Sequence, residues 1–326
     1  MPDSTNTTEA TLLEVRDITV EYVTQGQRFA AISDVSMDIA KGETLGLVGE
    51  SGCGKSTTGR AIIQLPTPTA GSVKFEGREL TELTHTDMRP IRKRLQIIFQ
   101  DPVSSLNPRR RVKDIVAEPL IISGMTNKAE IDAKVREVLN AVGMDPDITL
   151  DRRPHQFSGG QCQRICIARS LIMEPNLIVC DEPVSALDVS VQAQILNLLE
   201  DMKERYGLTL LFISHDLAVV KNISDRVAVM YLGKFCELAS SERIYEAPAH
   251  PYTAGLMATI PEIGDKSIDN AMALTGEIPS PLNPPSGCRF RTRCPHAQEK
   301  CAAEEPAFSE IEPGHQVACH FPLLGE

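Results

Sequence analysis

A short glycine-rich segment, residues 49–57, carries the residue types that bind phosphate groups. Its residues are Gly49, Glu50, Ser51, Gly52, Cys53, Gly54, Lys55, Ser56 and Thr57. The segment follows an apolar run and precedes a helical pattern, which is the context that a P-loop requires. Backbone N–H groups of such a loop surround phosphate oxygens, and the start of the next helix adds a favourable dipole. The pattern predicts that Lys55 reaches the β- and γ-phosphates of a nucleotide and that the Ser56 hydroxyl ligates Mg²⁺.

Two adjacent carboxylates, Asp181 and Glu182, end a second apolar run at residues 177–180. Side chains alternate along a strand, so the two carboxylates need not have the same role. Asp181 suits the coordination shell of Mg²⁺, directly or through water, and Glu182 suits the polarisation of an attacking water. Carboxylates at a strand end can also simply cap a turn. Their occurrence in one chain with the glycine-rich loop favours nucleotide chemistry.

A third segment, residues 157–161, opens a helical pattern whose apolar face carries Ile165, Ala168 and Ile172. After Phe157 it contains Ser158, Gly159, Gly160 and Gln161. A hydroxyl and bare backbone amides at a helix start form a second anion site, which the glycine-rich loop alone does not explain. An ordinary capped helix is the alternative. The chain therefore offers two half-sites for one triphosphate.

Four of the nine Cys, Cys288, Cys294, Cys301 and Cys319, lie near the end of the chain and are separated by five, six and seventeen residues. Four thiols in a proline-rich segment without periodic core residues favour a metal site over packed thiols. The close Cys-x2-Cys pairs of zinc ribbons are absent, but spacing alone does not separate a [4Fe–4S] cluster from Zn²⁺. Of the other five Cys, Cys162, Cys166 and Cys180 are expected to pack in the core, Cys53 belongs to the glycine-rich loop, and no special role is expected for Cys236.

The elements that must position these motifs alternate along the chain. Apolar runs at residues 44–48, 95–99, 176–180 and 208–213 are typical of strands buried on both faces of a parallel sheet. Helical patterns lie between them, at residues 131–142 and 191–202, which indicates an α/β domain. Near the N-terminus, residues 13–22, 35–39 and 73–75 approximate a period of two. They predict a smaller antiparallel sheet with one wet face.

Length and charge restrict the class of protein. The chain has 326 residues, enough for one large domain or two, and its net charge of −11 counts against a general nucleic-acid binder. No apolar run approaches the ~18 to 20 residues that span a bilayer, and the polar N-terminus does not resemble an export signal. We expect a cytoplasmic protein with a flexible segment at residues 1–11, and with membrane contact only through partners.

The motifs together resemble the ATPase subunits of ABC transporters over about residues 12–250. The resemblance rests on the order and spacing of the P-loop, Gln100, residues 157–161, the Asp181–Glu182 pair, residues 185–188 and His215. Phe157 replaces the Leu that is more common at the start of the signature motif. The implied fold is α/β, a P-loop NTPase with a RecA-like parallel-sheet core, an antiparallel β subdomain and a helical subdomain at about residues 101–172. A small Cys-rich C-terminal extension would follow at residues 251–326.

The resemblance also implies roles for single residues. In the family, the P-loop of one subunit faces the signature motif of its partner, so that a dimer encloses two ATP molecules. Tyr22 would then stack on adenine, Asp188 would communicate across the dimer, and His215 would contact the γ-phosphate. Gln100 would link Mg²⁺, held with Ser56 and Asp181, to the permease contact. The catalytic set would be Lys55, Gln100, Glu182 and His215. Strand packing of Tyr22 and a structural role for His215 are the alternatives.

The end of the chain resembles a narrower group. Residues 250–253, residues 287–295 and a late Cys-His pair are similar to the C-terminal extension of oligopeptide and dipeptide importer ATPases. Some of these carry a [4Fe–4S] cluster in that extension. The resemblance therefore favours such a cluster on Cys288, Cys294, Cys301 and Cys319, with a structural or redox-sensing role, over Zn²⁺ or free thiols.

The function implied by the resemblance is ATP-driven import of short peptides. The expected partners are a second ATPase subunit, commonly a different chain, two transmembrane permeases and an external peptide-binding protein, with this chain peripheral at the cytoplasmic face of the membrane. A soluble ABC ATPase of DNA repair or translation is less favoured, because heptad arms and a second cassette are absent. An exporter half-subunit or metal-ion importer is disfavoured by the tail. A scaffold without turnover is disfavoured as well, because it would lack Lys55, Glu182 or His215 and this chain has all three.

Overall fold

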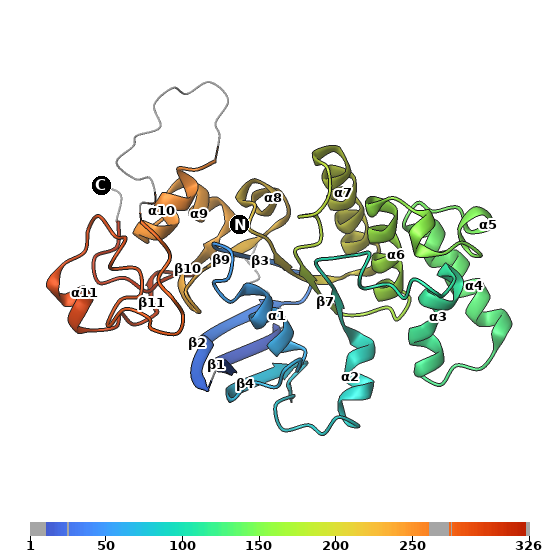
Figure 1. Ribbon diagram of the computed structural model, residues 1–326, viewed down its shortest axis with the longest axis horizontal. Coiled ribbons are helices and arrows are strands. Elements are labelled where there is room, and N and C mark those ends of the chain that lie inside the picture. Colours follow the sequence, from blue (N-terminus) through green and yellow to red (C-terminus); the bar gives the residue numbers. More distant parts are fainter. Residues whose placement is uncertain (1–10, 25, 261–273, 275, 324–326) are drawn as a thin grey trace, which may run out of the picture.

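The computed structural model describes residues 11–24, 26–260, 274 and 276–323. The N-terminal segment expected to be flexible lies outside these residues except for Thr11, which begins the first strand. The chain forms two sheets with helices around them, and the C-terminal segment lies at one end of the larger sheet, opposite a helical lobe (Figure 1).

The larger sheet has eight strands in the order β11-β12-β10-β9-β3-β8-β7-β6. Five strands form the parallel part of this sheet: β3 (Thr44–Val48), β6 (Leu95–Ile98), β7 (Leu177–Asp181), β8 (Thr209–Ile213) and β9 (Arg226–Tyr231). These five pair in parallel, and β10 (Lys234–Ser240) pairs antiparallel to β9. The parallel strands predicted from the apolar runs are therefore confirmed.

The smaller sheet is antiparallel, in the order β2-β1-β4-β5, as predicted from the period-two pattern. Its strands are β1 (Thr11–Thr24), β2 (Gln27–Ala40), β4 (Ala70–Phe75) and β5 (Arg78–Glu79). Helix α1 (Lys55–Ile62), which follows the glycine-rich loop, contacts both sheets and lies between them (Figure 1). The loop is thus fixed between two apolar layers.

Two groups of helices complete the fold. One forms the helical lobe: α3 (Val112–Ile122), α4 (Lys128–Ala141), α5 (Pro146–Thr149), η1 (Pro154–Gln156) and α6 (Gly159–Leu171). The other helices adjoin the sheets: α2 (Met88–Arg94), α7 (Val189–Tyr206), α8 (Leu217–Ile223), α9 (Ser241–Glu246), α10 (Pro251–Met257) and α11 (Glu299–Ala303). Asn127 caps α4 and Asp216 caps α8 with their side chains, which satisfies N–H groups that have no partner within the helix.

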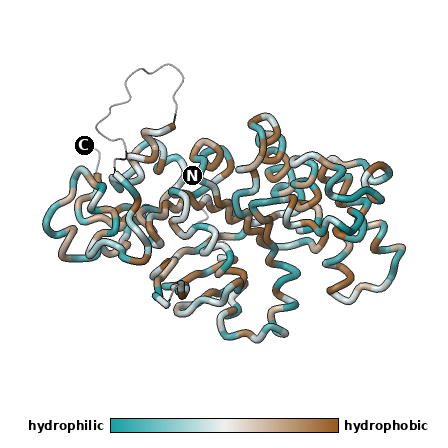
Figure 2. Tube along the Cα trace, viewed as in Figure 1, coloured by the Kyte–Doolittle hydropathy of each residue, from teal (hydrophilic) through white to brown (hydrophobic). Residues whose placement is uncertain are grey.

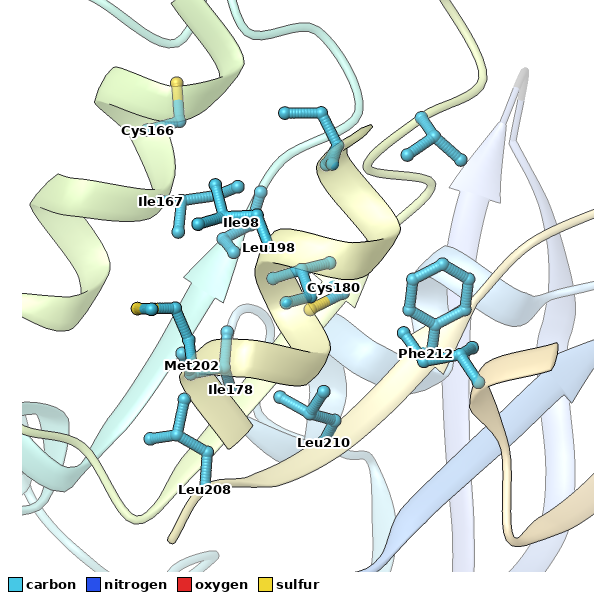
Figure 3. Close-up of a cluster of buried hydrophobic side chains, with 14 of the residues drawn as sticks. Ile98, Cys166, Ile167, Ile178, Cys180, Leu198, Met202, Leu208, Leu210 and Phe212 are labelled. Carbon is cyan, nitrogen blue, oxygen red and sulfur yellow. The ribbon is translucent and has the colours of Figure 1, made fainter. Parts of the chain in front are cut away.

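The core divides at the larger sheet, because neighbouring residues of a buried strand face opposite sides. Ile178 and Cys180 pack on the side of α6 and α7, whereas Leu177 and Val179 pack toward α1 and the smaller sheet. Figure 3 shows the first cluster, with Leu198 and Met202 of α7 against β7 and β8. Hydrophobic residues concentrate along the central strands in Figure 2. This burial on both faces explains why the strands are continuous apolar runs.

The C-terminal extension is joined to the larger sheet. β11 (Ser309–Glu312) and β12 (His315–Val317) form a hairpin, and β12 pairs with β10. At this junction, the buried Glu237 carboxylate lies 2.7 Å from His315 Nε2 and accepts hydrogen bonds from the backbone N–H groups of Ala249 and His250. Edge strands and a buried polar network therefore hold the loop-rich segment in place.

Candidate nucleotide site

The glycine-rich loop lies between β3 and the first turn of α1 and curves around the Lys55 ammonium. Gly49, Gly52 and Gly54 have φ angles of 150°, 77° and 112°, a region that residues other than Gly rarely adopt. Lys55 is 4% exposed, and its Nζ donates hydrogen bonds to the carbonyl oxygens of Gly49 at 2.7 Å and Glu50 at 3.0 Å. The backbone of the loop thus places one cation at its centre, as phosphate binding requires.

Asp181 lies beside the first turn of α1. It is fully buried at the end of β7, and Ser56 Oγ donates a hydrogen bond of 2.6 Å to its Oδ1. Arg60, one turn further along α1, donates to Oδ2 of the same carboxylate at 3.1 Å. A hydroxyl and a carboxylate are oxygen ligands of the kind that Mg²⁺ prefers, so this pair fits the ion.

Three residues predicted to take part in catalysis meet at one carboxylate. Gln100, which follows β6, donates from Nε2 to Glu182 Oε2 at 2.9 Å, and His215 Nδ1 lies 3.2 Å from the same oxygen. Glu182 is 9% exposed and has a positive φ of 50°, which turns the chain away from β7 directly after Asp181. The three side chains come from segments that follow neighbouring strands β6, β7 and β8.

These groups border a cavity of about 420 Å³. Its wall includes Ser51, Gly52, Gly54, Lys55, Ser56, Thr57, Gln100, Glu182 and His215, which are nine of the predicted site residues. The remaining wall comes from β2, from the β9–β10 turn and from the extension, through Phe29, Ala31, Leu232, Gly233 and Pro281. Oxygen and nitrogen groups thus face an apolar wall, as in a site for a nucleotide with a polar phosphate end and a flat base.

Tyr22 is not among the residues that line this cavity. The ring of Phe29, on the paired strand, borders it instead, with its centroid 6.1 Å from that of Tyr22. Tyr22 is 39% exposed. Sequence reasoning missed Phe29, although an aromatic residue in a hairpin partner of the predicted strand was the available signal.

The signature segment lies apart from the cavity, at the start of α6 in the helical lobe. Ser158 caps the helix: its Oγ accepts from Gln161 N at 3.3 Å, and Gln161 Oε1 accepts from Ser158 N at 3.0 Å. The exposed Asp188 directly precedes α7. Val191 of α7 packs against Gly160, where an added Cβ would lie 2.5 Å from the Val191 Cγ1 atom. The two predicted half-sites of one chain are therefore separate.

The four late Cys line one cavity, with His250 and His320 also on its wall. Burial raises the pKa of the Cys288 and Cys294 thiols and raises that of Cys319 to about 11. Among the residues that the structure describes, however, no three His, Cys, Asp or Glu side chains are arranged so that they could hold a metal ion. The predicted [4Fe–4S] cluster or Zn²⁺ site is thus not supported. The other five Cys are buried, which agrees with the core packing expected of Cys162, Cys166 and Cys180.

Comparison with known proteins is decisive for the family. Residues 32–185 match the ABC transporter family, and residues 236–301 match the oligopeptide/dipeptide transporter C-terminal region. A putative peptide import ATP-binding protein of Brucella ovis is 52% identical, over 96% of this chain and 98% of the relative. The chain belongs to the ABC transporter ATPases. The oligopeptide transport ATP-binding protein AppF of Bacillus subtilis is 48% identical over 96% of this chain and 98% of AppF. The oligopeptide transport ATP-binding protein OppF of Haemophilus influenzae is 50% identical over 91% of this chain and 90% of OppF.

Solved structures agree with this ABC ATPase fold. The dimeric ATP-binding cassette MJ0796, in a post-hydrolysis state with ADP and Pi, has a TM-score of 0.65 and 28% identity, covering 71% of this chain and 99% of the cassette. CbiO1 of Clostridium perfringens, part of an ABC transporter complex, has a TM-score of 0.65 and 26% identity, covering 73% of this chain and 92% of CbiO1. The chain is accordingly an ATP-hydrolysing cassette. Within its described residues, no helix is long and apolar enough to cross a membrane.

Several residues of this ABC ATPase site had no signal in the sequence. Arg60, on the Asp181 carboxylate, looks like any charged residue of an amphipathic helix. Pro281 and Arg293 belong to the extension, yet Pro281 borders the nucleotide cavity and Arg293 pairs with Glu50 of the P-loop. Contacts between such distant parts of the chain depend on tertiary packing, which local spacing does not report.

Proposed function

We propose that this chain supplies the energy for import of short peptides, as an ATP-hydrolysing subunit at the cytoplasmic face of a membrane. The observation that carries the proposal is the cavity where Lys55, Ser56, Gln100, Glu182 and His215 converge at the carboxyl ends of parallel strands. Such an edge is where ligands bind in open α/β sheets. Peptide as the solute is supported by the similarity to importer subunits over nearly the whole chain.

In the proposed site, the P-loop from Gly49 to Thr57 holds the phosphates of ATP. The Lys55 ammonium neutralises the negative charge of the β- and γ-phosphates, and the loop amides donate hydrogen bonds to their oxygens. Ser56 and Asp181 would hold Mg²⁺, with Gln100 as a further oxygen ligand, and the bound ion would neutralise charge at the phosphates. Arg60 keeps the Asp181 carboxylate oriented toward Ser56.

Glu182 is the proposed general base. Its carboxylate polarises the water that attacks the γ-phosphate, and Gln100 and His215 fix its orientation through the 2.9 Å and 3.2 Å contacts. His215 is half exposed, so its ring can turn from Glu182 to the γ-phosphate once ATP is bound. Positioning groups of this kind act by geometry and charge, because phosphoryl transfer needs little covalent chemistry from the protein.

A second ATPase subunit completes each site in this proposal. Ser158, Gly159, Gly160 and Gln161 lie at the start of α6, away from the cavity of their own chain, so they are available to the γ-phosphate held by another chain. Asp188 would contact the partner at the same boundary, and Tyr22 would reach adenine by a rotation toward the Phe29 side. Two different ATPase chains, two permeases and an external peptide-binding protein form the proposed assembly.

Glu182→Gln tests the hydrolytic role. The amide keeps the shape but does not accept a proton, so we expect turnover to fall by about 10²- to 10⁴-fold while ATP still binds and the dimer still closes. Steady-state phosphate release and ATP titration measure the two effects. Glu200→Gln, at an exposed position of α7, is the matched control and should leave both unchanged. Comparable turnover in Glu182→Gln and wild type removes Glu182 from the catalytic set.

The assembly is tested separately by tagged purification of the chain from detergent-solubilised membranes of its own cells. Two permeases, a second ATPase and a peptide-binding protein should co-elute. If the chain is purified with soluble partners, or with no partner despite intact ATPase activity, the importer assignment is contradicted. The proposed nucleotide site is not affected by that result.

We also propose that the C-terminal extension binds a metal, a [4Fe–4S] cluster or Zn²⁺. Its support is the convergence of Cys288, Cys294, Cys301 and Cys319 on one cavity, which the spacing of the thiols alone did not require. In the described residues these thiols are not arranged to hold a metal ion, so metal binding would require them to move. About four Fe and four acid-labile sulfides per chain after anaerobic purification support [4Fe–4S]. One Zn²⁺ per chain supports the alternative, and neither metal means free thiols.

A further inference from the structure

The segment from Cys288 to Cys294 belongs to the extension but contacts the P-loop. Arg293 donates from Nη1 and Nη2 to the two carboxylate oxygens of Glu50, at 2.7 Å and 3.0 Å. The Arg293 side chain is 5% exposed and the Glu50 side chain 22%, so the pair is largely shielded from water. Its two partners are separated by 243 positions in the sequence. Bidentate pairs of this kind fix orientation as well as distance.

A second residue beyond position 250 holds the same P-loop residue. The Tyr252 hydroxyl oxygen accepts a hydrogen bond of 3.0 Å from the backbone N–H of Glu50. Burial raises the pKa of Tyr252, so this hydroxyl stays neutral. The rings of Tyr252, Phe290 and Tyr231 pack against one another, and the Arg293 guanidinium lies 5.7 Å from the Tyr231 ring centroid. Both the backbone and the side chain of Glu50 are therefore fixed from one aromatic cluster.

A further part of the wall of the nucleotide cavity, the turn at Leu232 and Gly233, is held by the same segment. Arg289 donates to the carbonyl oxygen of Leu232 and, at 3.1 Å, to Ser33 Oγ. The next residue of that turn, Gly233, donates its N–H to the carbonyl oxygen of Cys53 in the P-loop at 2.7 Å. Two arginines of one short segment thus contact two parts of the site: Arg289 holds the turn at Leu232, which lines the cavity, and Arg293 holds the P-loop at Glu50.

We propose that Arg293 is a positioning residue for ATP binding, which acts by holding and neutralising Glu50. The inference rests on the proposed nucleotide site. Glu50 is a carboxylate within a loop that must receive a polyphosphate, so an unpaired charge there would repel the ligand. The pair with Arg293 cancels that charge and fixes the loop backbone, whose Glu50 carbonyl accepts a hydrogen bond from Lys55. Through Arg293, the extension then contributes directly to ATP binding.

Arg293→Ala should raise the Kd and the KM for ATP about tenfold, with kcat falling less than threefold, because the effect is on the loop that binds phosphate and not on Glu182. The Kd and KM of Arg293→Lys should lie between those of wild type and Arg293→Ala, since an ammonium keeps the charge but not the bidentate hydrogen bonding. Arg291→Ala is the matched control: Arg291 donates within the extension, to the carbonyl oxygen of Ser286 at 2.9 Å, and its replacement should leave Kd and KM unchanged.

Glu50→Gln distinguishes positioning through Glu50 from general support of the fold. In this background the repulsive charge is gone, so Arg293→Ala should change the ATP Kd by less than about twofold. An equal loss in both backgrounds overturns the proposal, as does an unchanged Kd with a lowered melting temperature. If Arg293→Ala does not fold, Glu50→Gln with Arg293→Lys gives the same cycle. Failure of the wild-type chain to bind ATP contradicts the nucleotide site itself.

Discussion

The P-loop and the cysteine cavity are both places where several polar groups meet, but they are built differently. The P-loop draws its groups from nine consecutive residues, and its glycines allow the backbone angles that surround Lys55. The cysteine cavity draws four thiols from a loop-rich segment of more than thirty residues. A contiguous motif carries its geometry in its own backbone, whereas dispersed residues obtain theirs from the packing around them.

This difference explains why the two predictions fared differently. The P-loop motif predicted a strand, a tight loop and a helix, and the described residues have all three in that order. The Cys spacing predicted proximity, which the structure has, and metal-ligating geometry, which the described residues do not have. Proximity follows from topology, but ligand geometry depends on sulfur positions to within a fraction of an ångström, which residue types do not encode.

The largest expected effect concerns Gly49, because its replacement attacks the contiguous motif at its first turn. Gly49 has a φ of 150°, and a Cβ at this position would lie 2.2 Å from the backbone oxygen of Met230. A backbone atom cannot move aside cheaply, so Gly49→Ala should abolish ATP binding or yield no folded protein. Gly42→Ala is the control, since Gly42 also has a positive φ of 82° but open space around it.

Urea unfolding and ATP titration separate the two variants. Gly42→Ala should lose only the cost of a left-handed backbone, about 1–2 kcal/mol, and should keep wild-type ATP affinity. Equal losses in both variants would mean that backbone angle alone, and not the contact with Met230, makes Gly49 necessary.

Much of the fold was predictable because burial on two faces leaves a clear pattern. Runs such as Thr44–Val48 and Thr209–Ile213 are fully buried strands, and the alternation of residues 13–22 became the antiparallel β1. The location of Asp181 and Glu182 could be predicted because strand ends in a parallel sheet collect at one edge, where Gln100 and His215 also lie. In these cases local pattern and global packing agree.

The remainder depended on contacts between distant positions. Arg293 and Glu50, Phe29 and the nucleotide cavity, and β12 beside β10 each require the relative placement of separate elements. Arg293 in the sequence is one of several arginines in a polar stretch, and nothing around it distinguishes it from Arg291. The physical information that selects Arg293 is the position of the P-loop, which only the folded chain provides.

A smaller effect is expected at the junction between the ATPase sheet and the extension. Burial alone would raise the pKa of Glu237, but hydrogen bonds from His315 and from the N–H groups of Ala249 and His250 outweigh it and lower the pKa. A carboxyl whose pKa is lower in the folded state adds stability above its unfolded value of 4.5, and this stability is lost as the pH falls through the folded value.

Glu237→Gln should therefore lower the free energy of unfolding at pH 7, by about 1–3 kcal/mol for the lost charge-assisted hydrogen bonds, and should flatten its decline between about pH 6 and pH 3. Chemical unfolding followed across this range measures both. Glu310→Gln, an exposed residue of β11, is the control and should retain the wild-type pH profile. A steeper decline in Glu237→Gln than in wild type contradicts a lowered pKa for Glu237.

The smallest effect is expected at Cys53, which tests whether every residue of a contiguous motif matters equally. Its side chain is 4% exposed and packs inside the loop, and burial raises the pKa of its thiol, so it stays protonated at neutral pH. Cys53→Ala removes one buried sulfur and should cost about 1 kcal/mol of stability while changing the ATP Kd less than twofold, as measured by the titration used for Arg293→Ala. A larger change in Kd would show that the thiol shapes the loop. The glycines and Lys55 would then not suffice to set the geometry of the motif, and the contrast with the dispersed cysteines would weaken.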